Sequence, residues 1–197
     1  MIPDGWKGKS LGEIAIFMMG YAFSSNDFCE DGVPLIRMGN LYQNRLSLDR
    51  NTVFLPMSFI ERYENLKINH GDILISMTGT MGKQDYGYAV LIPDDSPLML
   101  LNQRVTKINC KEYNSQEYLL YLLRSELVLK QIYSHPGGTK QANLSIKQLC
   151  GITVKVPPLL EQCRIAEILG VWDESIDLLE RLILEFRLRK KVKGSQG

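Results

Sequence analysis

The sequence predicts a mixed α/β (α+β) globular domain followed by one long C-terminal helix of the coiled-coil type. Short apolar segments bounded by turn residues predict strands, and capping signals between them predict short helices. Elements mixed in this way are typical of an α+β or mixed α/β body. A sustained heptad pattern near the end of the chain predicts the long helix. We expect the globular domain over residues 1–156, the helix over 157–193 and a disordered tail over 194–197.

The segment from Pro157 to Lys193 has the clearest periodicity. Its apolar residues recur in alternating steps of four and three, which is the a/d spacing of a heptad, at Ile165, Leu169, Trp172, Ile176, Leu179, Ile183 and Phe186. Pro158 suits the first turn, where a helix does not need its N–H. Such a helix would be roughly 50 Å long, more than a small body can cover. We therefore expect a partner helix; packing within the chain is the alternative.

The charges along this helix change sign from its start to its end. Acidic residues come early, at Glu167, Asp173, Glu174 and Asp177, and basic residues come late, at Arg187, Arg189, Lys190 and Lys191. Antiparallel pairing of two such helices brings opposite charges together, whereas parallel pairing stacks like charges. The sequence therefore predicts an antiparallel homodimer through the helix.

Within the preceding domain, turn and alternation signals predict strands in residues 6–18, 33–36, 45–55, 73–77, 86–92, 98–108 and 152–156. Helices are expected to begin at Phe59 and after Asn114 and Ser145, where a capping residue precedes an apolar run. Glycine-containing polar loops are expected at 78–82 and 137–143.

Composition sets limits on location and metal content. The 197 residues carry a net charge of +1, which does not suggest a protein that coats nucleic acid, although a basic face on a neutral body remains open. No apolar run is long enough for a membrane span, and the N-terminal segment lacks a secretory signal. The four cysteines form no C-x-x-C pair, and the two histidines are far apart. We expect reduced thiols, no metal site, no membrane contact and a cytoplasmic location.

Catalytic motifs are absent from the sequence. Gly79, Gly82 and Lys83 do not have Walker spacing, and Gln84 replaces the required Ser or Thr. An acidic residue never precedes a lysine by two positions, as many magnesium nucleases require, and the single Pro-Pro pair lacks the flanking residues of an amino-methyltransferase. Neither a G-x-S-x-G turn nor a glycine-rich nucleotide turn occurs. We expect a chain that is not an enzyme and binds no cofactor.

Polar residues cluster instead after the predicted strands. Arg, Lys, Gln and Asn side chains hold phosphates or read base edges. Our candidate DNA contacts are therefore Arg37, Asn40, Arg45, Lys83, Gln84, Tyr86, Arg104, Lys140 and Gln141. For any single cluster, a solvated loop explains the composition better than a binding site does, and the occurrence of three clusters on one body is what favours binding.

Several segments, taken in order, resemble the specificity subunit of type I restriction–modification enzymes. The matching segments are L-G-E-I-A at 11–15, P-L-I-R-M-G-N-L at 34–41, G-D-I-L-I-S-M-T-G-T-M-G at 71–82, L-N-Q-R-V at 101–105, G-T-K-Q-A-N-L-S at 138–145 and P-P-L-L-E-Q-C-R-I-A-E-I-L at 157–169. The resemblance implies a target-recognition domain followed by a long helix. Such subunits usually contain two of these units, whose helices pair antiparallel. This sequence contains one, as either a half-sized subunit that dimerises or part of a longer product.

The resemblance implies function as well as fold. Double-stranded DNA with a bipartite target, modification (methyltransferase) subunits and a restriction subunit are the implied partners. S-adenosylmethionine, ATP and magnesium would belong to those partner subunits. The alternative is a protein-interaction scaffold that dimerises through its coiled coil without reading DNA.

Overall fold

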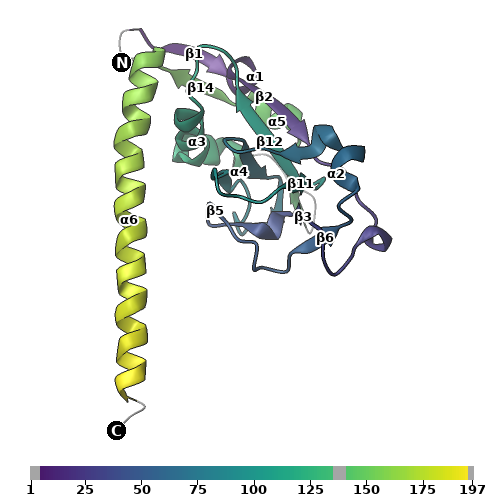
Figure 1. The fold of residues 1–197 in the computed structure, drawn as a ribbon. Coiled ribbons are helices and arrows are strands. Elements are labelled where there is room, and N and C mark those ends of the chain that lie inside the picture. The colour runs from purple at the N-terminus through teal and green to yellow at the C-terminus, as the bar shows by residue number, and fades with distance from the viewer. Residues whose placement is uncertain (1–4, 135–140, 195–197) are drawn as a thin grey trace.

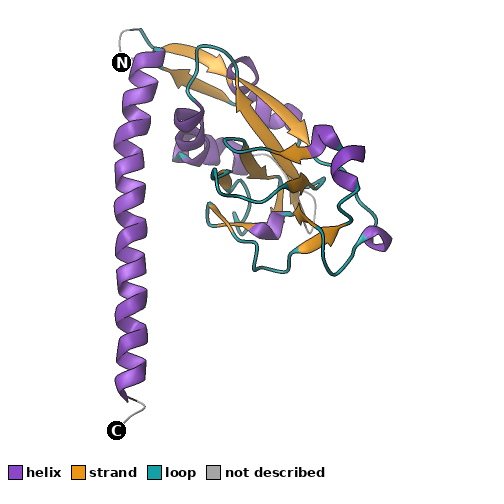
Figure 2. Ribbon diagram, viewed as in Figure 1, coloured by secondary structure: helices purple, strands orange, loops and turns teal. Residues whose placement is uncertain are grey.

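The computed structural model describes residues 5–134 and 141–194 of the chain. It consists of a mixed α/β body and one long helix, α6 (Leu159–Gly194), which runs along one side of the body and beyond it (Figure 1). Figure 2 shows strands and short helices interleaved throughout the body, as the sequence predicts. Gly194 is the last residue of α6, so the predicted tail otherwise lies outside the described residues.

Two four-stranded sheets form the centre of the body. The first sheet is antiparallel, in the order β10 (Ala89–Leu91), β8 (Ile73–Ser76), β12 (Val105–Cys110), β2 (Ala15–Met19). In the second sheet β11 runs parallel to β3 and the other pairs are antiparallel, in the order β6 (Val53–Leu55), β3 (Val33–Ile36), β11 (Met99–Leu101), β7 (Lys67–Ile68).

Three two-stranded ladders complete the sheet structure. They are β1 (Lys7–Ser10) with β14 (Thr153–Val156), β9 (Thr78–Thr80) with β13 (Gln141–Asn143), and β4 (Leu41–Tyr42) with β5 (Arg45–Leu46). The first ladder joins the two ends of the body next to the start of α6. The last ladder is a hairpin that lies on the α6 side of the body (Figure 1).

Short helices cover the sheets. They are α1 (Leu11–Ile14), α2 (Phe59–Arg62), α3 (Gln116–Arg124), α4 (Glu126–Ser134) and α5 (Ile146–Gly151), with 3-10 turns η1 (Ser25–Asp27), η2 (Met38–Asn40) and η3 (Glu64–Leu66). The capping box predicted at Ser145 and Gln148 is confirmed. Ser58 makes no side-chain cap, so the one predicted for α2 is wrong.

Strand β8 has a separate hydrophobic core on each of its faces. Ile73 and Ile75 belong to one core, which α3, α4 and α5 cover, whereas Leu74 belongs to the other core, with the second sheet. Successive side chains of a strand point to opposite faces, so a strand buried on both faces needs a continuous apolar run. This explains the sequence I-L-I, which shows no alternation between apolar and polar residues.

The strands predicted at 33–36, 73–77 and 152–156 and the long helix are confirmed within about two residues. Other predictions are wrong in part. Residues 6–18 contain β1, the helix α1 and most of β2 rather than one strand, and the strand predicted at 86–92 is limited to β10. Residues 141–143, predicted as part of a loop, form β13. Residues 45–55 form two short strands, and 98–108 form β11 and β12 with a turn between them. Residues 78–80 are strand rather than loop, because they pair with β13, about sixty residues later in the chain.

The first turns of α6 are docked on the body through buried polar contacts. The side chain of Gln162, only 1% exposed, accepts a hydrogen bond from Ser115 N (2.9 Å) and donates one to Pro157 O (2.9 Å). Nε1 of Trp6 donates to Oε1 of Glu161 (3.1 Å), and Ala166 is buried against the core of the body. The P-P-L-L-E-Q segment is therefore the joint between body and helix.

Beyond this joint the heptad seam is exposed. Ile165 is partly buried on the body, but Trp172 is 64% and Phe186 67% exposed, and the seam residues between them are also exposed. Packing against residues 5–134 and 141–194 therefore does not cover the seam. Burying one Leu or Ile side chain contributes roughly 1.5–3 kcal/mol, so the row favours a partner.

We predict that Gln162→Ala lowers the free energy of unfolding by about 1–3 kcal/mol, because it leaves Ser115 N–H and the Pro157 carbonyl buried without partners. Urea denaturation at fixed protein concentration measures the change. Cys163→Ala, at the adjacent exposed position, is the control and should unfold as the wild type does. Equal midpoints for Gln162→Ala and wild type would contradict the structural role of this amide.

Candidate nucleic-acid interface

The ends of β3, β8 and β11 meet at one place on the body. The Asn102 N–H donates to Ile36 O (3.1 Å), which brings the turn between β11 and β12 next to Arg37. Met77 N–H donates to Arg104 O (3.0 Å), and Leu144 N–H donates to Met77 O (2.8 Å). Segments that are far apart in the sequence therefore converge here.

The β9–β13 ladder adds a further polar segment. Its register pairs Gln141 with Thr80 and Asn143 with Thr78. The loop after β9 folds back on it, because Lys83 N–H donates to Thr80 O (3.1 Å). Lys83 and Gln84 are thereby held beside Gln141.

Asp85 closes this loop. Its Oδ1 accepts a hydrogen bond from Thr80 N–H (2.6 Å). Burial alone would raise the pKa of this carboxyl, but the hydrogen bonds from Thr80 outweigh it and hold the pKa below its ordinary value. Gly79 makes the fold-back possible, because a Cβ there would lie 2.4 Å from Asp85 Oδ1 and 2.7 Å from Tyr86 Cδ1. The glycine at position 79 of the M-T-G-T-M-G segment is therefore explained by the lack of space for a side chain.

These segments form what we call the tip surface, consisting of Arg37, Lys83, Gln84, Arg104 and Gln141. All five side chains are exposed. None of the three cations forms an ion pair with any residue in the described ranges, 5–134 and 141–194. Donors from four separate segments are thus available to a ligand. Lys140 lies outside the described residues.

Two candidate contacts are corrected because their side chains are buried. Asn40 is 1% exposed; it accepts from Arg37 N–H and donates to Ser47 O, Arg50 O and Thr52 Oγ1, so it holds the chain after β3. Tyr86 is buried with its ring edge-on to Tyr133, 5.2 Å between centroids. Burial raises the pKa of the Tyr86 hydroxyl. Both residues support the interface from within rather than face a ligand.

Arg45 is also placed differently from the prediction. It lies on β5 and forms ion pairs with Asp177 and Glu180 of α6 rather than joining the tip surface. Local sequence offered no signal for this, because the acidic partners follow more than 130 residues later.

Sequence reasoning missed an aromatic cluster beside the tip surface. Tyr21 is half exposed and its carbonyl accepts from Gln103 N–H (3.0 Å), which connects it to the turn that carries Arg104. Its ring contacts those of Phe23 and Tyr63, and the Arg62 guanidinium lies 5.4 Å from the Tyr63 ring centroid. These residues come from separate segments, so no local pattern could have revealed them.

The described residues contain no group of three or more His, Cys, Asp or Glu side chains that could hold a metal ion. The four cysteines are free thiols. Within residues 5–134 and 141–194, no helix is long and apolar enough to cross a membrane.

Comparison with known proteins places this geometry in a family. The model of the type I restriction modification DNA specificity domain matches residues 3–186. The type I restriction enzyme EcoAI specificity subunit of Escherichia coli is 31% identical over 183 residues, covering 92% of this chain and 30% of that protein. The MjaVIII specificity subunit of Methanocaldococcus jannaschii is 29% identical over 178 residues, covering 90% and 41%.

Solved structures have the same fold. The HsdS subunit from Thermoanaerobacter tengcongensis superposes with a TM-score of 0.62 at 19% identity, covering 92% of this chain and 40% of that one. The S subunit of a type I restriction–modification system from M. genitalium has a TM-score of 0.64 at 17% identity, covering 90% and 41%.

The fold is thus that of a DNA specificity domain with a long attached helix. The chain belongs to the type I restriction–modification specificity subunit family. It spans less than half the length of these relatives.

We predict that Asp85→Ala accelerates hydrogen exchange of the Thr80 amide by roughly tenfold or more, because the charged acceptor is lost. Hydrogen-exchange mass spectrometry or NMR measures the rate. Since the folded pKa of Asp85 is lowered, the carboxylate's contribution is present above its unfolded pKa and is lost as pH falls through the folded value. Asp95→Ala, in an exposed turn, is the control. An unchanged Thr80 rate in Asp85→Ala would refute this role.

Proposed function

We propose that this chain is the DNA-recognition part of a type I restriction–modification system, and that the tip surface contacts double-stranded DNA. The observation that carries the proposal is the convergence of exposed cations and amides from separate strand ends in a member of this family. Arg and Lys suit phosphates, and Gln offers the bidentate pattern that reads adenine. A net charge of +1 is compatible with this, because the positive charge is local.

The chain's role in this proposal is recognition without chemistry. Modification and restriction subunits would join it, and S-adenosylmethionine, ATP and magnesium would be bound by those subunits. Relatives that match most of this chain are named specificity subunits, which supports the assignment. A cytoplasmic location follows from the same proposal, because the DNA and the partners are there.

The exposed seam of α6 supports a homodimer with antiparallel helices. The acidic start of one helix would then face the basic end of the other. Twofold symmetry would place two identical recognition bodies at opposite ends of a coiled coil about 50 Å long, which exceeds one DNA turn of about 34 Å. The proposed target is a bipartite palindrome with an unread spacer.

The exposed seam equally favours the second candidate, a scaffold that pairs through α6 without reading DNA. Salt dependence separates the two. Affinity that depends on phosphate contacts falls steeply as salt rises, because counterions are released on binding. A gel shift of the complex with its modification subunit, at a series of salt concentrations, distinguishes the candidates.

We predict that Lys83→Ala weakens binding to all DNA sequences alike and reduces the salt slope by about one. A tip-surface residue that reads a base, for which Gln84 and Gln141 are candidates, should cost about 1–3 kcal/mol at one target position when changed to Ala. Binding measured on a set of target variants gives both results. Lys7→Ala, on exposed β1 away from the tip surface, is the control. If Lys83→Ala, Gln84→Ala and Lys140→Ala all leave methylation rate and target unchanged, the assignment is wrong.

We predict that Ile176→Asp with Ile183→Asp gives a folded monomer that no longer supports methylation of a bipartite target. Two carboxylates in the seam would be desolvated on pairing, whereas in the single chain both positions are exposed. Analytical ultracentrifugation and circular dichroism test assembly and folding separately. Wild-type chain that sediments as a monomer at micromolar concentration with its modification subunit, or a mapped target with one contiguous block, would refute the dimer.

A further inference from the structure

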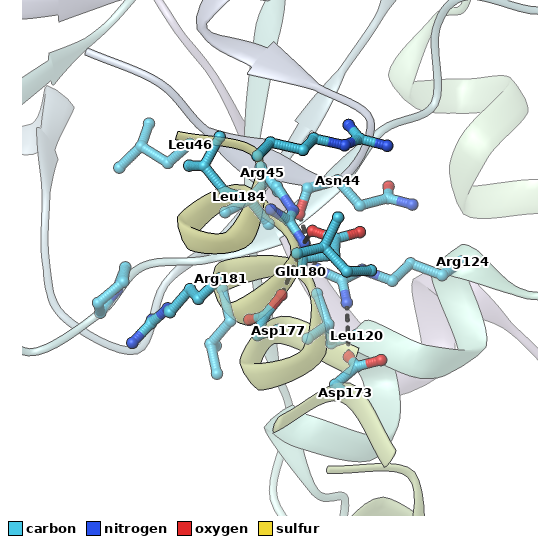
Figure 3. Close-up of a pocket in the computed structure, with 15 residues that line it drawn as sticks. Asn44, Arg45, Leu46, Leu120, Arg124, Asp173, Asp177, Glu180, Arg181 and Leu184 are labelled. Carbon is cyan, nitrogen blue, oxygen red and sulfur yellow. Dashed lines mark hydrogen bonds and ion pairs between the residues drawn. The ribbon is translucent and has the colours of Figure 1, made fainter. Parts of the chain in front are cut away.

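A groove of about 940 Å³ separates α6 from the body below their joint. Figure 3 shows its charged lining, with Arg45 and Arg124 on the body side directed at Asp173, Asp177 and Glu180 of α6. From residue 171 to 190, every residue of α6 is exposed. Side-chain packing therefore does not hold this part of the helix against the body.

Hydrogen bonds within the body hold both Arg45 and Arg124 in place. Gln43 and Asn44 form a two-residue hairpin turn with φ of 51° and 60°, the geometry of tight hairpins. The Asn44 side chain accepts from Ala89 N–H (3.0 Å), so the hairpin that carries Arg45 is tied to the central sheet. Arg124, at the end of α3, donates to Ala89 O (3.0 Å) and to Asn44 O (3.1 Å).

The acidic partners on α6 are spaced for this contact. Asp173, Asp177 and Glu180 lie four and three residues apart, so they share one face of the helix. Arg45 Nη2 lies 2.6 Å from Asp177 Oδ1 and 2.5 Å from Glu180 Oε2. Arg124 Nη1 lies 3.2 Å from Asp173 Oδ2. These contacts cross the groove about 16–27 Å along the helix from the joint at Gln162.

We propose that Arg45, Arg124, Asp173, Asp177 and Glu180 form an ionic strut that sets the angle between recognition body and helix, and thereby the spacer length accepted between half-sites. The inference rests on the proposed function. Without the strut, the body would be held by the contacts of the first turns of α6, which include the buried ones near Gln162 and Ala166. A rotation at that joint would move the tip surface along the DNA.

The strut controls the angle between the body and α6 rather than the free energy of unfolding. Exposed ion pairs contribute little to folding because water and salt screen them. The strut acids are half exposed. Replacing these acids should therefore leave the fold intact but allow the angle between the body and α6 to vary.

The experiment uses the chain in complex with its modification subunit and duplexes that carry the mapped half-sites with spacers from two base pairs shorter to two longer. Methyl transfer is measured for each spacer. We expect wild type to prefer one spacer by at least about tenfold, since small misplacements reduce rates strongly. Asp177→Lys with Glu180→Lys should reduce that preference to about threefold or less. Adding Arg45→Glu to this double variant should restore the narrow profile, because the ion pairs re-form with reversed charges.

The matched control is Glu112→Lys with Glu185→Lys, which makes the same change in net charge at exposed positions outside the groove. It should keep the wild-type spacer profile. A narrow wild-type profile that is unchanged in Asp177→Lys with Glu180→Lys would overturn the strut and leave the proposed function standing. Wild type that methylates no bipartite target would overturn the proposed function, and the spacer role with it.

Small-angle X-ray scattering of the DNA-free protein tests the mechanical part separately from any DNA reading. The lysine double variant should show a larger and broader distribution of interatomic distances than wild type, and the charge-swapped variant should return to the wild-type curve. Identical curves for wild type and the double variant, with circular dichroism confirming that both are folded, would show that the strut does not fix the angle.

Discussion

The arrangement depends on the docking of the first turns of α6 through one buried amide. Gln162 satisfies Ser115 N–H at the start of α3 and the carbonyl of Pro157, which are polar groups that burial would otherwise leave unpaired. Because the helix enters from β14, the strand that pairs with β1, both ends of the body meet at this point. The direction in which the apolar seam projects follows from this short joint.

Periodic features of the fold could be predicted from the sequence. The heptad seam, β3, β8 and the capping box of α5 each follow from residues that are close together in the chain. Pairings between distant segments could not be predicted. The strand β9 exists because β13 pairs with it, and nothing within residues 78–82 indicates that partner. A glycine-containing polar segment therefore reads as a loop until its partner is known.

The residues of the candidate interface likewise divide into those that the sequence could predict and those that it could not. Loop position and donor chemistry selected Arg37, Lys83 and Arg104, whose side chains are exposed. They could not distinguish an asparagine that ties its own turn together from one that faces solvent. Asn40 uses its amide on Arg37, Ser47, Arg50 and Thr52, and residue type alone does not reveal this. Arg45 is a similar case, because its acidic partners lie on a distant helix.

The double burial of β8 has a consequence for how the body responds to heat or denaturant. The strand contributes side chains to both cores, Ile73 and Ile75 to one and Leu74 to the other. If either core opened, the strand would lose half of its packing and the ladders to β10 and β12 would weaken together. The two halves of the body are therefore thermodynamically inseparable, and the body should melt in a single cooperative transition.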